Sequence, residues 1–294
     1  MIQHLFQQGP VIAGILKTAA AAVGSRPTQQ PPLPTAAITR TVAPRPRALI
    51  DDYLRHIGAD PAHYRGVVPA HLWPQWGFPL AAATLTGIPY ALTRVLNGGC
   101  RLDIHAPLPD DEPLDVRATL EAIDDDGTRA LLTQRIVTGT RSAPDAVVAT
   151  LTAYVPLAKK SGGKEGKEKP TVPEGAREIA RHTLGGGAGW TFALLTGDFN
   201  PVHWVRPWAR AAGFPGTILH GFSTLAHALA ALDTARLAGD PTRLTRVDAR
   251  FVRPLVLPAQ IGVYVSGDRL TVGTHPGGPA YMTADVQLRE DMDV

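Results

Sequence analysis

The segment 221–232, with the sequence GFSTLAHALAAL, constrains the fold more than any other feature of the chain. Its apolar residues recur at helical spacing and most of its residues are good helix formers, so it predicts a very apolar helix. Such a helix needs other elements to bury it. Strand-like runs follow at 244–257, 260–265 and 280–288. Together these patterns predict an α+β architecture, with an antiparallel sheet wrapped round a central helix.

The first half of the chain repeats this layout. A short helix is expected at 49–57 and again at 190–196, where Gly197 would end it. A second apolar helix is expected from 78–86, and four strand-like runs follow it, at 101–105, 114–123, 130–138 and 146–155. A DDDG sequence between two of these runs is typical of a hairpin turn. The repetition predicts an internal duplication, with two α+β units in one chain.

Segments that cannot form a core separate these units. Residues 26–46 are rich in proline, and 158–176 combine Ser-Gly-Gly, alternating Lys and Glu, and two prolines. The second of these compositions is typical of a flexible linker. We therefore expect an N-terminal extension, a first unit, a linker and a second unit, at 1–35, 36–157, 158–176 and 177–294.

The positive charge of the chain is concentrated in the expected linker. The formal net charge is +3, and 159–169 holds five of the six lysines and two glutamates, which accounts for the whole excess. No aromatic residue interleaves with these lysines, as a stacking platform for bases would require. The basic balance therefore does not predict nucleic-acid binding.

The composition is that of an ordinary globular protein, with 44% hydrophobic and 19% charged residues. The sequence has no run of about 18 apolar residues, so no membrane-spanning helix and no membrane partner are expected. Cys100 is the only cysteine, which excludes an internal disulfide and fits a reducing, cytoplasmic location.

The residues best suited to chemistry lie in the loop GDFNPVH, after the second short helix. Asp198, Asn200 and His203 are close together there, and Pro201 stiffens the loop. A carboxylate, an amide and an imidazole suit proton transfer to and from a water molecule, because histidine titrates near neutral pH and a carboxylate fixes its tautomer. A structural interpretation is also open: a helix-capping aspartate, a turn asparagine and a hydrogen-bonded histidine.

His220 and Gly221 immediately precede the apolar helix. The Gly221 amide would lie at the helix N-terminus, where amides have no acceptor within the helix and carry a positive partial charge. Such an amide can polarise a carbonyl oxygen as an oxyanion hole does, and glycine permits close approach of a ligand. The alternative is a simple turn into a helix.

Taken together, GDFNPVH at 197–203 and GFPGTILHG at 213–221 resemble the signature of the MaoC-like (R)-specific enoyl-thioester hydratases and 3-hydroxyacyl-thioester dehydratases. The resemblance covers 177–290, and the first half resembles the degenerate unit of the two-hotdog members. It implies a double hotdog fold, in which two antiparallel sheets each wrap round a long central helix. It also implies an enzyme that works without a cofactor or a metal.

The resemblance implies a role for each residue of the motif. Asp198 and His203 would activate the water that adds to C3 of a trans-2-enoyl thioester, and one of them, Asp198 in preference, would exchange the proton at C2. Asn200 would orient the water or the pair. The Gly221 amide would stabilise enolate-like charge on the thioester oxygen. The product would be a (3R)-3-hydroxyacyl thioester, and dehydration is the same path reversed.

Four further residues are candidate substrate contacts: His220, Phe222, Trp204 and Arg253. Trp204 either packs over the loop or lines the mouth of the pocket. Arg253 either meets a pantetheine phosphate or a carrier-protein surface, or is a solvated strand residue. A metal site built from His220 and His227 would lack an accompanying acidic or cysteine cluster, so no metal site is expected.

The first half contains a faint echo of the motif, GADPAH at 58–63. Aligning the proline and histidine of the two loops places Gly58 opposite Asp198. The acid–base pair is therefore expected to be broken in the first half, because His63 has no partner at the right spacing. A structural role is expected for this half, with a loosened helix that leaves room for a long acyl tail.

Several functional questions stay open at this level. The stretch after the motif histidine, WVRPWA at 204–209, lacks the acid that many relatives carry there, so substrate preference is in doubt. The acyl group can be carried by CoA or by an acyl carrier protein. A hotdog thioesterase and a non-catalytic acyl-thioester-binding protein are the alternatives to a hydratase. A monomer and a homodimer are equally compatible with two hotdogs in one chain.

Overall fold

The structure is a computed structural model that describes residues 2–9, 29–91, 95–157 and 169–289. Most of the expected N-terminal extension and most of the expected linker lie outside the described residues. The proposed boundaries of the four parts therefore stay predictions.

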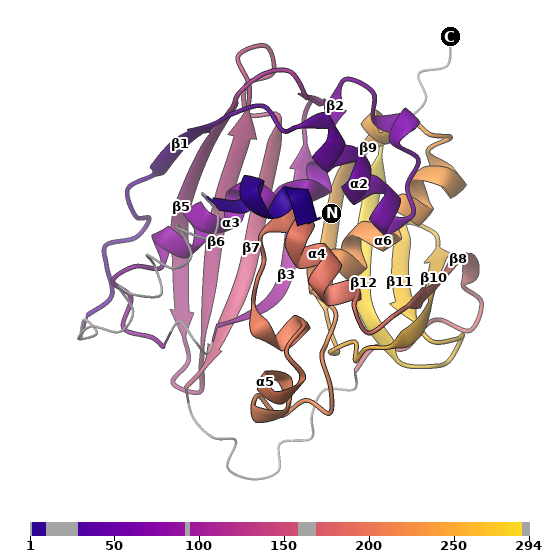
Figure 1. Cartoon of the computed structure of the whole chain (residues 1–294). Helices are drawn as coiled ribbons and strands as arrows, with labels where there is room; N and C mark the ends of the chain where they lie inside the picture. The colour runs from indigo at the N-terminus through magenta and orange to yellow at the C-terminus, as the bar shows by residue number, and fades with distance from the viewer. Residues whose placement is uncertain (1, 10–28, 92–94, 158–168, 290–294) are drawn as a thin grey trace.

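The two halves of the chain share the order of their main elements: a strand, a short helix, a 3-10 turn, a central helix and four strands (Figure 1). After η1 (Ile2–Gln8), the first half consists of β1 (Ile38–Val42), α2 (Arg47–Ile57), η2 (Pro61–Tyr64), β2 (Val67–Val68), η3 (Ala70–Leu72), α3 (Pro74–Thr84), β3 (Leu96–Ile104), β4 (Leu108–Pro109), β5 (Leu114–Asp125), β6 (Arg129–Gly139) and β7 (Val147–Pro156). The second half consists of β8 (Arg177–Leu184), α4 (Ala188–Thr196), η5 (Pro201–His203), α5 (Arg206–Ala211), α6 (Gly221–Arg236), η6 (Pro241–Arg243), β9 (Leu244–Phe251), β10 (Ala259–Ser266), β11 (Arg269–Gly273) and β12 (Ala280–Leu288).

Ten strands form a single antiparallel sheet, in the order β1-β5-β6-β7-β3-β9-β12-β11-β10-β8. Read outward from the middle, each half supplies the same series: β3, β7, β6, β5 and β1 on one side, and β9, β12, β11, β10 and β8 on the other. This matching topology shows the duplication that the sequence predicted. The two five-stranded sheets are not separate, because β3 pairs with β9 and joins them edge to edge.

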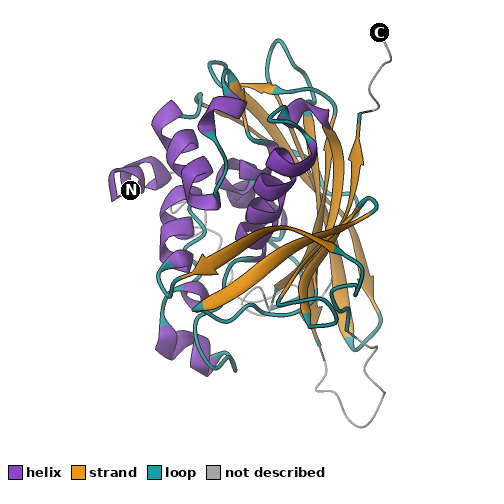
Figure 2. Ribbon diagram, turned by 90° about the vertical axis from the view of Figure 1, so that its right-hand side faces the viewer, coloured by secondary structure: helices purple, strands orange, loops and turns teal. Residues whose placement is uncertain are grey.

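The helices lie together on one face of this curved sheet (Figure 2). One continuous core runs through both halves and includes Leu54, Trp73 and Leu102 from the first and Leu225 and Val247 from the second. The catalytic candidates therefore sit on a scaffold to which both halves contribute. Among the described helices, none is both long enough and apolar enough to cross a membrane.

The two central helices differ in length. α6 has 16 residues and α3 has only 11. The sequence interpretation placed Pro79 in the first turn of its helix, but α3 begins earlier, at Pro74, so Pro79 lies in the helix interior. A proline there removes one helical hydrogen bond, which fits the short length of α3. The strands β1, β8 and β11 were not expected from the sequence.

The N-terminal η1 packs on the outside of the helical layer, against α4. The Gln8 amide donates hydrogen bonds to the carbonyls of Leu194 and Leu195, at 3.2 and 3.1 Å. These carbonyls belong to the last turn of α4, where helical acceptors have no partner within the helix. Gln8 therefore satisfies the end of the helix that leads into the candidate site.

Candidate active site

The loop that contains the candidate acid and base begins where α4 ends. Gly197 adopts φ +80°, a left-handed conformation that glycine takes without strain, and its amide bonds back to Ala193. Asn200 then caps η5, because its Oδ1 accepts a hydrogen bond from the Val202 amide at 3.3 Å. Pro201 occupies the first position of η5, where a missing N–H costs nothing. The loop predicted from GDFNPVH thus has a defined shape, set by glycine, asparagine and proline.

His203 is oriented by the segment that leads into α6. Its Nδ1 lies 2.8 Å from the carbonyl oxygen of Ile218. A carbonyl only accepts, so Nδ1 carries the proton and Nε2 of the neutral ring carries the lone pair. This is the tautomer that a general base requires at Nε2.

The Asp198 carboxylate lies close to His203 without a direct hydrogen bond between the two side chains. One carboxylate oxygen and one ring nitrogen each of His203 and His220 all lie within 4.8 Å of one another. A water molecule that hydrogen-bonds to two groups at about 2.8 Å each can bridge such a gap. The side chain of Asp198 is 18% exposed, so the pair is largely buried but reachable.

Burial shifts the pKa of both partners in opposite directions. Desolvation raises the pKa of Asp198, although the charge of His203 and a hydrogen bond from the Asn200 amide oppose the change. Desolvation lowers the pKa of His203, against the influence of Asp198 and of the bond to Ile218. A carboxyl with a raised pKa and a neutral imidazole are the forms that exchange protons near neutral pH.

The Gly221 amide opens α6 next to this pair. It is the first residue of the helix, where an N–H has no acceptor within the helix. A Cβ at this position would lie 2.8–2.9 Å from the ring of Phe251. Glycine is therefore required by packing as well as suited to the approach of a ligand oxygen.

The chain is similar to known proteins over most of its length. A model of the MaoC like domain matches residues 173–275. The chain is 31% identical over 211 residues to the enoyl-CoA hydratase ChsH3 of Mycobacterium tuberculosis, covering 70% of this chain and 69% of that protein. This chain belongs to the MaoC-like hydratase and dehydratase family.

A further relative supports the family assignment, and a solved structure supports the fold. The 3-hydroxyacyl-thioester dehydratase X of M. tuberculosis is 28% identical over 220 residues, covering 71% of this chain and 75% of that protein. The crystal structure of HtdX from M. tuberculosis superposes with a TM-score of 0.69 at 24% identity, over 85% of this chain and 99% of that chain. With the sheet topology described above, these matches confirm the double hotdog fold.

His220 lies inside the site of this MaoC-like chain. Its ring is 1% exposed and is stacked on the ring of His203, with centroids 3.6 Å apart and planes 27° apart. The sequence interpretation considered a metal site only from His220 and His227, and it did not consider Asp198, which lies beside His220. Among the described residues, Asp198, His203 and His220 are the one group arranged closely enough to hold a metal ion, and His227 is not part of it.

Gly189 is a positioning residue that the sequence interpretation missed. It lies in the first turn of α4, and a Cβ there would fall 2.1 Å from the carbonyl oxygen of His203. Any side chain would push the catalytic loop away from α4. One glycine in the run GGGAG gave no signal that its neighbour in space is 14 residues further along the chain.

The other expected substrate contacts have other neighbours. Phe222 is buried in a cluster of aromatic rings. Trp204 is 38% exposed, rests on the ring of Trp190 and donates its indole N–H to the carbonyl of Phe199. The guanidinium of Arg253 donates to the backbone carbonyls of 169, 170 and 280, which ties the end of the expected linker to β12. These contacts account for Arg253 without a phosphate, so its proposed substrate role finds no support here.

The first-half loop corrects the alignment made from the sequence. Gly58 ends α2 at φ +84°, so it is the counterpart of Gly197 and not of Asp198. Asp60 caps η2 through a 2.8 Å bond from the Ala62 amide, as Asn200 caps η5. The first loop is thus one residue shorter, and Ala59 follows its glycine. No acid directly follows the glycine, as expected, but the residue opposite Asp198 is Ala59 and not Gly58.

His63 has no acidic partner at the spacing of the second-half pair, but it has one from the other half of the chain. Its Nδ1 lies 2.7 Å from a carboxylate oxygen of Asp233, which is 170 residues away on α6. The Asp233 side chain is 1% exposed and that of His63 is 29% exposed. The pair therefore links the first-half loop to the central helix of the second half.

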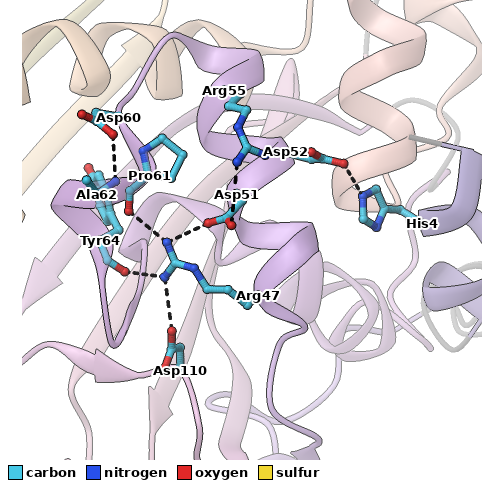
Figure 3. A network of polar contacts seen from close by, with 10 residues as sticks. All are labelled: His4, Arg47, Asp51, Asp52, Arg55, Asp60, Pro61, Ala62, Tyr64 and Asp110. Atoms are coloured by element: carbon cyan, nitrogen blue, oxygen red, sulfur yellow. Dashed lines mark hydrogen bonds and ion pairs between the residues drawn. The ribbon is translucent and has the colours of Figure 1, made fainter.

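An arginine holds the first-half loop from the other side (Figure 3). Arg47 of α2 donates to the carbonyls of Tyr64 and Pro61, at 2.6 and 2.9 Å, and its charge is balanced by Asp51 and Asp110. These bonds fix η2 through its backbone. In this MaoC-like chain the first-half loop therefore has a structural role: it connects α2 of the first half to α6 of the second half.

Proposed function

We propose that the protein catalyses the reversible hydration of trans-2-enoyl thioesters to (3R)-3-hydroxyacyl thioesters, with Asp198 and His203 as its acid–base pair. The observation that carries the proposal is the arrangement of these two groups. They approach within 4.8 Å without bonding to each other, beside the free amide at the start of α6. The kinship with an enoyl-CoA hydratase and a 3-hydroxyacyl-thioester dehydratase supports the same reaction.

In the hydration direction, a water molecule held between the two groups loses a proton and its oxygen forms a bond to C3. The C2–C3 π electrons move toward the thioester carbonyl, and the Gly221 amide stabilises the charge that develops on its oxygen. C2 then takes a proton, which Asp198 delivers. His203 takes the proton from the water and Asp198 gives a proton to C2, so the pair keeps its number of protons. Transfer of the proton from His203 to Asp198 then restores the starting state. Asn200 orients the loop through its cap on η5 and the bond from its amide to Asp198.

The substrate is an acyl thioester of CoA or of an acyl carrier protein, and the reaction as written uses no cofactor. His220, Phe222 and Trp204 lie on or beside the catalytic loop and the start of α6. Of these, Trp204 is the exposed one, so it is the side chain best placed to meet the substrate at the surface.

The test is the hydration of crotonyl-CoA by the purified protein, followed as loss of the enoyl-thioester absorbance, with the configuration of the product determined. Asp198→Asn should lower kcat/KM by at least about 10²-fold, because a general acid–base group contributes 10²–10⁴-fold. Asp233→Asn is the matched control. Asp233 is also a largely buried aspartate beside a histidine, but that histidine is His63 of the first-half loop. This substitution should change kcat/KM by less than about 3-fold.

Two results would overturn the proposal. One is full activity in Asp198→Asn. The other is release of free thiol from acyl-CoA without hydration, detected with a thiol reagent, which would identify a thioesterase. A protein that binds enoyl-CoA but leaves it unchanged would be an acyl-thioester-binding protein.

A further inference from the structure

The candidate catalytic groups come from two loops, and one buried side chain touches both. His220 stands at the position before α6, with Gly221 as its covalent neighbour. Its Nε2 lies 3.0 Å from the backbone carbonyl oxygen of Asp198, and its ring stacks on His203. Asp198, His203 and Gly221, the three parts of the proposed site, therefore all meet at His220.

The hydrogen-bond partner fixes the protonation of this ring. The Asp198 carbonyl can only accept, so Nε2 of His220 carries the proton. Nδ1 of the neutral ring then carries a lone pair, and it is buried without any partner. A proton added at Nδ1 would create a buried N–H without an acceptor, which is costly. Accordingly, burial and the neighbouring His203 hold the pKa of His220 well below its usual value.

Packing fixes the plane of the ring. The Phe192 ring of α4 lies 4.9 Å from that of His220, at an angle of 42°, and His203 lies 3.6 Å away, at 27°. His220 is thus in contact with an α4 side chain and with the catalytic histidine. His203 is in turn held at its edge by the Ile218 carbonyl, two residues before His220. The short segment 218–221 therefore supports the catalytic histidine at its edge and at its face.

We infer that His220 is a positioning residue: as a neutral imidazole with its proton on Nε2, it sets the distance between Asp198 and the plane of His203. The inference rests on the proposed function. His220 does not exchange protons with the substrate in this scheme. Its neutrality matters, because a second positive charge 3.6 Å from His203 would oppose the charge that His203 gains when it accepts a proton.

Two substitutions separate the two contacts. His220→Phe keeps an aromatic ring against His203 but removes the N–H that holds the Asp198 carbonyl. His220→Gln keeps an N–H donor at a similar distance but removes the stacked ring. Each should lower kcat for crotonyl-CoA about 10- to 100-fold, since displacements near 1 Å can cost that much. KM should change by less than about 3-fold, because neither variant removes a group that touches the substrate.

The pH–rate profile is the reading that a purely structural role would leave unchanged. Asp198 and His203 titrate as a pair, so a change in their spacing shifts the apparent pKa values of the profile. Both variants should shift at least one limb of the profile. His227→Gln is the matched control, because His227 is as deeply buried in α6 and donates to the Ser223 carbonyl, yet it does not contact His203. It should lower stability and leave both kcat and the profile as in the wild type.

The inference is overturned if both His220 variants fold and keep wild-type kcat and pH profile. Should they fail to fold, the nitrogen-15 spectrum of the histidines in the unmodified protein decides. His220 should show the Nε2–H tautomer and no titration between about pH 5 and 8. A ring protonated at Nδ1, or one that titrates in this range, would overturn it. If the unmodified protein does not hydrate enoyl-CoA at all, the proposed function fails instead, and the spectrum still reports on His220.

Discussion

The two halves of the molecule contain the same turn and use it for different purposes. In each half a short helix ends at a left-handed glycine, and a proline-containing 3-10 turn with a histidine at its third position follows. In the second half His203 faces Asp198, which lies five residues earlier in the same loop. In the first half His63 bonds to Asp233 of the other half. The turn itself therefore does not make an active site. The carboxylate that faces the histidine determines whether the turn has a structural or a chemical role.

The partners differ in how they hold the histidine. Asp233 bonds directly to His63 at 2.7 Å, so the pair is closed and has no space for a bridging molecule. Asp198 makes no such bond to His203, and both groups keep hydrogen-bonding capacity for a water. A directly bonded pair adds to structure, whereas a pair held apart in a largely buried site is available for chemistry.

The helices before the two turns differ as well. Counting back eight positions from the terminating glycine gives Gly189 in α4 and Ile50 in α2. Gly189 lets the backbone of His203 approach so closely that a Cβ at position 189 would clash with it. The corresponding residue in the first half is large and buried. The close approach of loop and helix is therefore particular to the half that contains the proposed site.

The largest difference between the halves should appear when each histidine is replaced. His203→Gln removes the proposed base and should lower kcat/KM for crotonyl-CoA by about 10²-fold or more. His63→Gln should leave kcat/KM within about 3-fold and lower the free energy of unfolding by about 1–3 kcal/mol, because the buried Asp233 loses its partner. Steady-state kinetics and urea unfolding measure the two effects. Comparable losses of activity in both variants would show that the first-half turn also takes part in catalysis.

A smaller effect is expected from the helix that supports the loop. Gly189→Ala must move the His203 backbone, because no Cβ can lie 2.1 Å from a carbonyl oxygen. We expect kcat to fall about 10-fold or more. Gly186→Ala is the matched control in the same glycine run, since a Cβ there meets nothing within 4 Å. Equal activity of the two variants would mean that the spacing of loop and helix does not matter.

Much of this arrangement could be predicted from the sequence, because it depends on local patterns. The range of β12, the start of α6 and the glycine that ends α4 follow from periodicity and from backbone preference. The loop GDFNPVH identified the candidate acid and base, since their spacing along the chain is short and fixed.

The missed features all depend on contacts between distant residues. His63 and Asp233 are 170 positions apart, and no sequence pattern around either residue predicts the contact between them. Gly189 matters only because another backbone segment passes beside it. Gly58 was set opposite Asp198 because a single sequence does not show that the first loop is one residue shorter. Such features follow from packing, which periodicity does not encode.

A third test asks whether the two halves unfold together. It uses one deeply buried histidine from each half to report on the stability of that half. Burial lowers the pKa of His71 in η3 and of His227 in α6 to about 3. In the unfolded chain a histidine titrates near 6.5. Because the folded-state values are depressed, each contribution to stability is present above pH 6.5 and is lost as the pH falls from there toward 3. Between pH 7.5 and 5.5 each histidine should cost the folded state about 1.4 kcal/mol.

The measurement is the free energy of unfolding in urea at these two pH values, for the wild type, His71→Gln and His227→Gln. The free energy of unfolding falls between pH 7.5 and 5.5, and each substitution should reduce this fall by about 1.4 kcal/mol. This holds if the ten-stranded sheet and the shared core make the halves one cooperative unit. A single transition whose pH dependence responds equally to both substitutions would support this. Two transitions, each sensitive to only one substitution, would show instead that the halves unfold separately, and that the β3–β9 pairing and the His63–Asp233 bond do not couple them.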